Sequence, residues 1–184
     1  MNKIAAVTST RADYGLLSNL IGALKNDQAF DFSLIVTGTH LSQKHGMTVQ
    51  EIVSDGFRVD TKIAMALDDD DKVELTLAAA SLTQKIAKKL KALALDAIII
   101  LGDRFEILPV AYAAALQNIK IIHLHGGEIT LGAIDNKMRF AISHLADFHL
   151  TATKKSKQRL VSSGIEEKYV VNTGAIGVEN AINL

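Results

Sequence analysis

The stretch Ala97-Ile98-Ile99-Ile100-Leu101-Gly102-Asp103-Arg104-Phe105-Glu106 joins a short apolar run directly to a glycine and charged residues. A continuous apolar run bounded by a glycine is typical of a strand buried on both faces of a parallel sheet. The polar residues behind it would lie at the carboxyl end of that strand, where open α/β sheets bind ligands. This stretch therefore predicts both a fold class and a place to look for chemistry.

Similar runs recur along the chain and predict strands at Ile4–Thr8, Phe32–Thr37, Ala97–Leu101, Ile119–Leu124, Phe148–Thr151 and Tyr169–Asn172. The alternating segment Phe57–Ile63 predicts a further strand nearer an edge. Helical faces lie between them, formed by Leu16, Leu17, Leu20, Ile21 and Leu24 and by Val73, Leu77, Ala80, Ile86 and Leu90. Strands alternating with helices predict an α/β fold, a doubly wound, mostly parallel sheet with helices on both faces.

The chain has 184 residues, 48% hydrophobic and 22% charged, with 20 basic side chains balancing 20 acidic ones. The length suits one domain, and the zero net charge argues against nucleic-acid and anionic-membrane partners. The lack of cysteine excludes disulfide scaffolds, Cys-ligated metal centres and thiol nucleophiles. The first residues form no signal peptide, and Ala92–Leu101, interrupted by Asp96, is too short to cross a membrane. We therefore expect a soluble, cytoplasmic protein.

The segment Ser9–Gly15 follows the first predicted strand and leads into a helix, without the G-x-G-x-x-G pattern of dinucleotide-binding loops. Arg11 lies just before the helix N-terminus, whose free N–H groups attract anions, and this arrangement suits a phosphate or diphosphate. Asp13 can cap the helix. Alternatively, Arg11 and Asp13 form a surface ion pair that only stabilises the turn.

Asp103 and Arg104 follow the strongest predicted strand. A carboxylate at a strand end can act as an acid or base, and the neighbouring arginine can bind a substrate phosphate. Asp103 can equally cap the next helix with Arg104 as its ion-pair partner. The residues themselves leave both readings open.

His123-Leu124-His125-Gly126-Gly127-Glu128 is the densest polar cluster. Two histidines spaced by two point the same way on an extended segment, which makes a metal pair conceivable, although H-x-H alone is a weak signal. One histidine could instead be a hydrogen-bonded interior residue. The glycines allow close approach of backbone to a ligand and favour binding or acid/base work.

Two charge runs have simpler interpretations. Asp68–Asp71 predicts the start of a long helix, where carboxylates favour the positive end of the helix dipole. Its far end carries Lys85, Lys88, Lys89 and Lys91. The basic run Lys154–Arg159 predicts a solvated helix face, because no aromatic residue interleaves it.

Taken in chain order, the motifs resemble those of the hydrolysing UDP-N-acetylglucosamine 2-epimerases, most closely the members of the sialic- and legionaminic-acid pathways. The matching segments are Thr8–Gly15, Gly102–Glu106, His123–Glu128, Gly132–Asp135 before a helix with Arg139 and Ile142-Ser143, and Gly174–Asn180. They cover essentially the whole chain.

The resemblance implies two Rossmann-like domains in a glycosyltransferase-B-like arrangement, with residues 1–184 forming only the N-terminal one and the C-terminal nucleotide-binding domain absent. It implies elimination of UDP through a 2-acetamidoglucal and addition of water, giving N-acetylmannosamine or a diacetamido analogue for nonulosonic acid biosynthesis. No cofactor or metal is implied. The expected partners are a UDP-sugar and further copies of the chain in a homo-oligomer.

Under this resemblance the catalytic residues are Asp103, His125, Glu128 and Asp135. The substrate-binding residues are Arg11, Asp13, Gly15, Arg104, His123 and Arg139. The chain departs from the family pattern in three places: His125 replaces a glutamate found in many members, while Asn136 and Phe140 remove an acid and a histidine. The alternative is an isolated, non-catalytic domain that folds or self-associates without turnover. In either case we expect this chain alone to bind UDP weakly.

Overall fold

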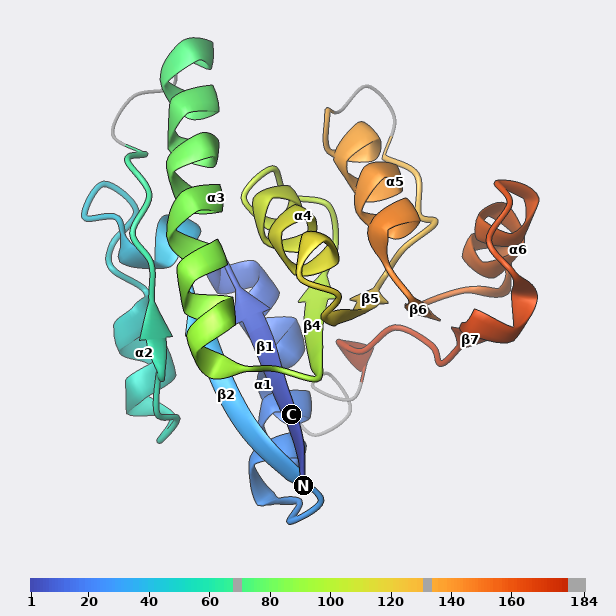
Figure 1. Cartoon of the computed structure of the whole chain (residues 1–184), viewed down its shortest axis with the longest axis horizontal. Coiled ribbons are helices and arrows are strands. Elements are labelled where there is room, and N and C mark those ends of the chain that lie inside the picture. Colours follow the sequence, from blue (N-terminus) through green and yellow to red (C-terminus); the bar gives the residue numbers. More distant parts are fainter. Residues whose placement is uncertain (68–70, 131–133, 179–184) are drawn as a thin grey trace.

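In a computed structural model of the chain, residues 1–67, 71–130 and 134–178 are described. Within these ranges seven strands form one sheet with every neighbouring pair parallel, in the order β3-β2-β1-β4-β5-β6-β7 (Figure 1). The strands are β1 (Asn2–Thr8), β2 (Phe30–Val36), β3 (Thr61–Lys62), β4 (Ala97–Leu101), β5 (Lys120–Leu124), β6 (Phe148–Thr151) and β7 (Val170–Asn172). The doubly wound sheet predicted from the sequence is confirmed, although the edge strand β3 is only two residues long.

The helices are α1 (Arg11–Asn26), α2 (Val49–Ser54), α3 (Lys72–Leu93), α4 (Ile107–Leu116), α5 (Asp135–Leu145) and α6 (Lys154–Ser162), with short 3₁₀ turns at Gly38–Leu41 and Glu167–Tyr169. Two cores lie on opposite faces of the sheet, because successive strand residues point to opposite sides. Helices α1 and α2 cover one face, and α3, α4 and α5 cover the other. None of the helices in the described ranges is both long and apolar enough to span a membrane.

Helix α3 corrects one expectation. The residues that pack on the sheet are Ala78, Leu82, Ile86 and Leu90, one turn apart along the helix. Val73 and Leu77, predicted to lie in the core, are 64% and 56% exposed. Both sets repeat at helical spacing, and the sequence does not show which of the two apolar stripes meets the sheet.

Of the two charge runs, the basic one lies on a helix as predicted, and the last residue of the acidic one is the cap of α3. Asp71 caps α3 by accepting hydrogen bonds from the backbone N–H groups of Val73 and Glu74 at 2.8 and 3.2 Å, whereas residues 68–70 lie outside the described residues. The basic run forms much of α6, where Lys154 and Lys155 are exposed.

Candidate functional site

The strand order places a topological switch point between β1 and β4. The chain moves outward from β1 to β2 and β3 and then returns to the other side of β1 as β4. In doubly wound sheets the loops that follow such strands diverge, and ligands bind there. Electrostatic contacts link the residues gathered at this point into one switch-point cluster: Asp13, Asp103, Arg104, Glu106, His125, Glu128, Asp135 and Arg139.

Asp103 is held by a buried arginine from a different element. Its carboxylate accepts a short hydrogen bond from Nη2 of Arg139 in α5, and Arg139 also donates to the hydroxyl of Thr130 at 3.4 Å. Burial raises the pKa of Asp103, and the nearby carboxylates of Asp135 and Asp13 add to this effect, while Arg139 opposes it. The interpretation of Asp103 as a helix cap paired with Arg104 is therefore wrong, because Asp103 pairs with Arg139.

Arg104 pairs instead with Glu106, two residues further along. Its Nη2 atom donates to Oε1 of Glu106 at 3.0 Å. Glu106 is fully buried, and its Oε2 atom has no hydrogen-bond partner among the described residues. Asp13 and Asp135 also act on Arg104 through their charges. Glu106 was not among the predicted site residues, although its place in the loop after β4 was a usable signal.

The loop after β1 corrects two expectations, the helix cap by Asp13 and the ion pair of Arg11 with Asp13. Thr10, not Asp13, caps α1, since its hydroxyl accepts from the Asp13 N–H at 3.2 Å. Asp13 accepts from the Ser9 hydroxyl at 2.8 Å and belongs to the switch-point cluster; burial raises its pKa, against the lowering effect of these hydrogen bonds. Arg11 is 74% exposed and pairs with Glu51 of α2 at 2.8 Å, so the Arg11–Asp13 pair does not form.

Gly15 lies exposed in the first turn of α1. Apart from its chain neighbours and the backbone of α1 itself, no described atom lies within 4 Å of the position that a Cβ atom would take there.

His123 is the interior histidine that the sequence left open. It is fully buried in β5, with Nε2 donating to the Gly102 carbonyl at 2.7 Å and Nδ1 accepting from the Ser143 hydroxyl at 3.0 Å. Burial lowers its pKa to about 3, so the ring is neutral. His123 fixes the backbone just before Asp103 rather than facing solvent.

His125 does not share the direction of His123, because its backbone is left-handed with φ of 60°. Its Nε2 atom accepts from the Ile176 N–H at 3.3 Å, and Nδ1 faces Oε1 of Glu128 at 3.8 Å. Burial lowers the pKa of His125, while Glu128 opposes that shift. Within the described residues no three His, Asp or Glu side chains are grouped to hold a metal ion.

The two glycines after His125 are required by the protein itself. A side chain at Gly126 would lie 2.9 Å from the Ser143 hydroxyl, and one at Gly127 would collide with the Ser156 carbonyl of α6. These glycines therefore let the loop pack against α5 and α6. The sequence predicted that these glycines allow the backbone to approach a ligand, but in the structure they allow it to approach the protein's own helices.

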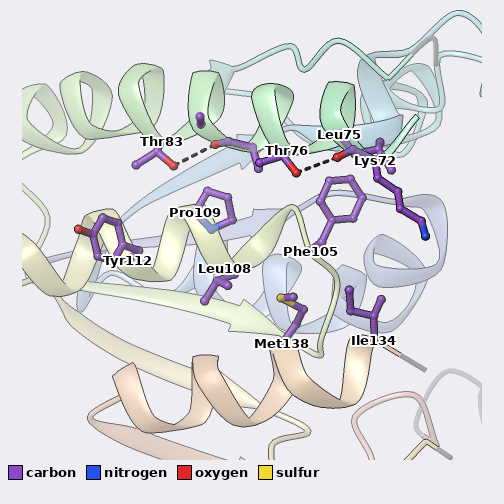
Figure 2. A pocket seen from close by; sticks show the side chains of 12 residues that line it. Lys72, Leu75, Thr76, Thr83, Phe105, Leu108, Pro109, Tyr112, Ile134 and Met138 are labelled. Carbon is purple, nitrogen blue, oxygen red and sulfur yellow. Dashed lines mark hydrogen bonds between the residues drawn. The ribbon is translucent and has the colours of Figure 1, made fainter. Parts of the chain in front are cut away.

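A second, apolar region lies beside the cluster. Figure 2 shows this hollow between α3, α4 and α5, with side chains from all three helices turned into it. Its volume is about 740 Å³, and its apolar lining includes Leu75, Ala79, Phe105, Leu108, Tyr112 and Met138. We call it the α3–α5 hollow.

The motif residues 132, 133, 179 and 180 lie outside the described residues. Asp135 opens α5 and acts on Asp103 and Arg104 through its charge. Arg11 pairs with Glu51 instead of joining the cluster, and His123 holds the Gly102 carbonyl just before Asp103. The predicted site residues that the structure brings together are Asp13, Asp103, Arg104, His125, Glu128, Asp135 and Arg139.

Two curated 2-epimerases are similar to this chain in sequence. GDP/UDP-N,N'-diacetylbacillosamine 2-epimerase (hydrolyzing) from Campylobacter jejuni is 39% identical over 174 residues, covering 95% of this chain and 45% of that protein. UDP-N,N'-diacetylbacillosamine 2-epimerase (hydrolyzing) from Legionella pneumophila is 37% identical, with coverages of 97% and 47%. The chain thus spans about half the length of the curated relatives it matches.

Among solved structures, UDP-GlcNAc 2-epimerase from Neisseria meningitidis bound to UDP-GlcNAc superposes with a TM-score of 0.85 at 19% identity. The match covers 98% of this chain and 49% of that one, and it shows a shared fold. The family model for UDP-N-acetylglucosamine 2-epimerase matches residues 22–184. The chain therefore belongs to the UDP-N-acetylglucosamine 2-epimerase family.

Proposed function

We propose that this chain is the N-terminal half of a hydrolysing UDP-sugar 2-epimerase. A base removes the proton from C2 of the sugar, the C1–O bond breaks, and UDP leaves to give a 2-acetamidoglucal. The oxygen of water then bonds to C1, and a proton returns to C2 on the opposite face. The products are UDP and N-acetylmannosamine, or its diacetamido analogue, for nonulosonic acid biosynthesis.

The observation that carries this proposal is the Asp103 carboxylate at the switch point. Removing a proton from carbon requires a base held close to it and tuned toward neutral pH. Asp103 is fixed by Arg139, and its pKa is raised by burial and by its carboxylate neighbours. These properties fit a group that exchanges a proton with C2 on one face of the sugar.

Inversion at C2 requires proton transfer on both faces of the sugar. The cluster offers Asp135 and Glu128 with His125 as companions of Asp103. We assign Asp103, Asp135 and the pair of Glu128 with His125 to the acid/base steps. Asp13 and Gly15 would line the substrate, and His123 and Arg139 would hold Asp103 in place.

The switch-point cluster holds more carboxylates than arginines, and this affects where the diphosphate can bind. Its two arginines each already pair with a carboxylate, Arg104 with Glu106 and Arg139 with Asp103. Further carboxylates surround them, so this wall is acidic overall. Arg104, and Arg11 if released from Glu51, would assist UDP departure, while most of the diphosphate charge would be met outside this chain.

The test is direct. The longer protein that contains this chain should be incubated with UDP-N-acetylglucosamine and, separately, with UDP-N,N'-diacetylbacillosamine. Release of UDP with a free sugar epimerised at C2 from either substrate is expected, and the preferred substrate identifies the sugar. Intact substrate in both reactions would contradict the proposal. The 184-residue chain, assayed beside it, should show weak UDP binding and little turnover.

The α3–α5 hollow favours a second candidate role, self-association. Tyr112 of α4 lines the hollow and is 50% exposed, and two further apolar side chains, Val73 and Leu77, are exposed on α3 outside its lining. Exposed apolar surface of this kind marks contact sites. We propose that copies of the chain associate through this region, as a homo-oligomeric enzyme or, in the alternative reading, as a domain without turnover.

A further inference from the structure

The backbone at His125 is in an unusual conformation. Its φ of 60° is left-handed, a region that non-glycine residues rarely enter because it is sterically unfavourable. The His125 N–H donates to the Leu150 carbonyl of β6 at 2.9 Å, which holds the conformation in place. The turn swings the ring away from the interior position of His123 and toward the loop after β7.

The partners of the ring determine which nitrogen carries the proton. The backbone N–H of Ile176 can only donate, so Nε2 of His125 must accept, and it does so at 3.3 Å. A neutral imidazole then carries its proton on Nδ1. That atom faces Glu128 Oε1 at 3.8 Å, longer than a hydrogen bond but close enough for a small movement of Glu128 to form one.

The neighbouring charges favour this neutral form. Arg139 and burial both disfavour a second proton on the ring, and only Glu128 opposes them. The side chain of Glu128 is 35% exposed, so it can reach a ligand while remaining beside Nδ1.

We infer that His125 is a positioning residue, which orients the Glu128 carboxylate through Nδ1–H and holds the segment after β7 through Nε2. Glu128 is then the member of the pair that exchanges a proton with the substrate. The part of this inference that concerns Glu128 rests on the proposed function, whereas the tautomer and the contact with Ile176 do not.

The tautomer can be measured on the chain itself. Long-range ¹H–¹⁵N correlation spectra of histidine-labelled protein at pH 7.5 should show His125 protonated on Nδ1 only, with the signal assigned by its loss in His125→Gln. A ring protonated on Nε2, or on both nitrogens, would overturn the inference.

Two variants separate the roles of the two nitrogens. His125→Gln places an acceptor near the Nε2 position and should keep the Ile176 amide protected from hydrogen exchange. His125→Asn places a donor near the Nδ1 position and should lose that protection. If both variants leave the Ile176 amide protected as in the wild type, His125 does not hold the segment after β7.

Turnover of the longer protein gives the complementary readout. His125→Gln should lower kcat by about tenfold or more with little change in KM, as expected for a lost supporting contact, and His125→Asn should retain more activity. Equal loss in both variants would show that the imidazole itself transfers the proton. If the wild type does not turn over either substrate, the proposed function fails while the tautomer measurement stands.

Discussion

The switch-point cluster and the α3–α5 hollow share elements but have opposite chemistry. Phe105 lines the hollow while its neighbours Arg104 and Glu106 pair within the cluster. In the same way Met138 lines the hollow and the next residue, Arg139, holds Asp103. Adjacent residues in the loop before α4 and in α5 thus contribute to two different surfaces.

Both regions cost folding stability, and each cost points to a function. Packing several carboxylates beside two arginines lowers stability unless every charge is paired, and such clusters mark functional sites. Apolar side chains exposed to water in a hollow are unfavourable for stability, and such a surface marks a contact site. Each region can therefore be tested by a change that leaves the other intact.

The largest effect should come from Asp103→Asn in the longer protein. The amide keeps the shape and one hydrogen bond to Arg139 but cannot accept the substrate proton. We expect turnover to fall by roughly 10²–10⁴-fold, the usual contribution of an acid/base group. Turnover of UDP-sugar and the melting temperature should be measured on the same sample.

Asp96→Asn is the matched control for this change. Asp96 lies just before β4, at the end of the strand opposite Asp103, and accepts from the backbone N–H of Lys3 at 2.7 Å. Its substitution should leave turnover unchanged. Near-normal turnover in Asp103→Asn with a lowered melting temperature would mean that Asp103 serves only as the partner of Arg139.

The next effect concerns acid and the histidines beneath the cluster. Burial lowers the pKa of His123 to about 3 and those of His40 and His149 to about 4. Both ring nitrogens of His149 lack a hydrogen-bond partner among the described residues. The unfolded chain takes up protons below its histidine pKa of 6.5 while the folded chain does not, so stability is lost as the pH falls.

Urea unfolding at pH 7 and pH 5 should show this loss, about 2 kcal/mol for each buried histidine. The raised pKa values of Asp13 and Asp103 have the opposite effect on stability, because the folded chain takes up these two protons more readily than the unfolded chain as the pH falls. His45→Gln, at an exposed position, should leave the pH dependence unchanged. An unfolding free energy equal at both pH values would contradict the burial of neutral histidines.

The comparison also shows which features the sequence could predict. Apolar runs located most of the sheet, and the residues after each run located the cluster, because strand ends in a parallel sheet meet at one edge. The partners could not be predicted in the same way. Arg139 lies 36 residues from Asp103, and Glu51 lies 40 residues from Arg11, so these pairs depend on how α5 and α2 pack.

Backbone conformation was the other limit. The alternation rule that places His123 and His125 on one side assumes an extended chain. The chain is not extended at His125, where φ is left-handed, and the residue type at this position does not predict that conformation. In α3, the exposure of Val73 and Leu77 depended on which of the two apolar stripes packs on the sheet.

A smaller effect should follow a charge placed at the hollow. Tyr112→Glu alters a side chain that lines the hollow and is 50% exposed, so folding should be unaffected while self-association weakens by at least about tenfold. Sedimentation velocity over a concentration series measures this. Val53→Glu is the control, since Val53 is 55% exposed on α2, which packs on the opposite face of the sheet. A wild-type chain that stays monomeric throughout would exclude association through the hollow.

The smallest effect is expected for Arg11, which belongs to neither region in this structure. Its exposed pair with Glu51 contributes at most about 1 kcal/mol to folding, so Arg11→Ala and Glu51→Ala should lower stability equally and slightly. Their effects on UDP binding should differ. If Arg11 swings to the diphosphate, Arg11→Ala weakens binding several-fold at low salt, whereas Glu51→Ala frees the arginine and leaves binding equal or stronger. Calorimetric titration of UDP into the longer protein separates these outcomes, because equal affinities in both variants and the wild type would confine Arg11 to its surface pair.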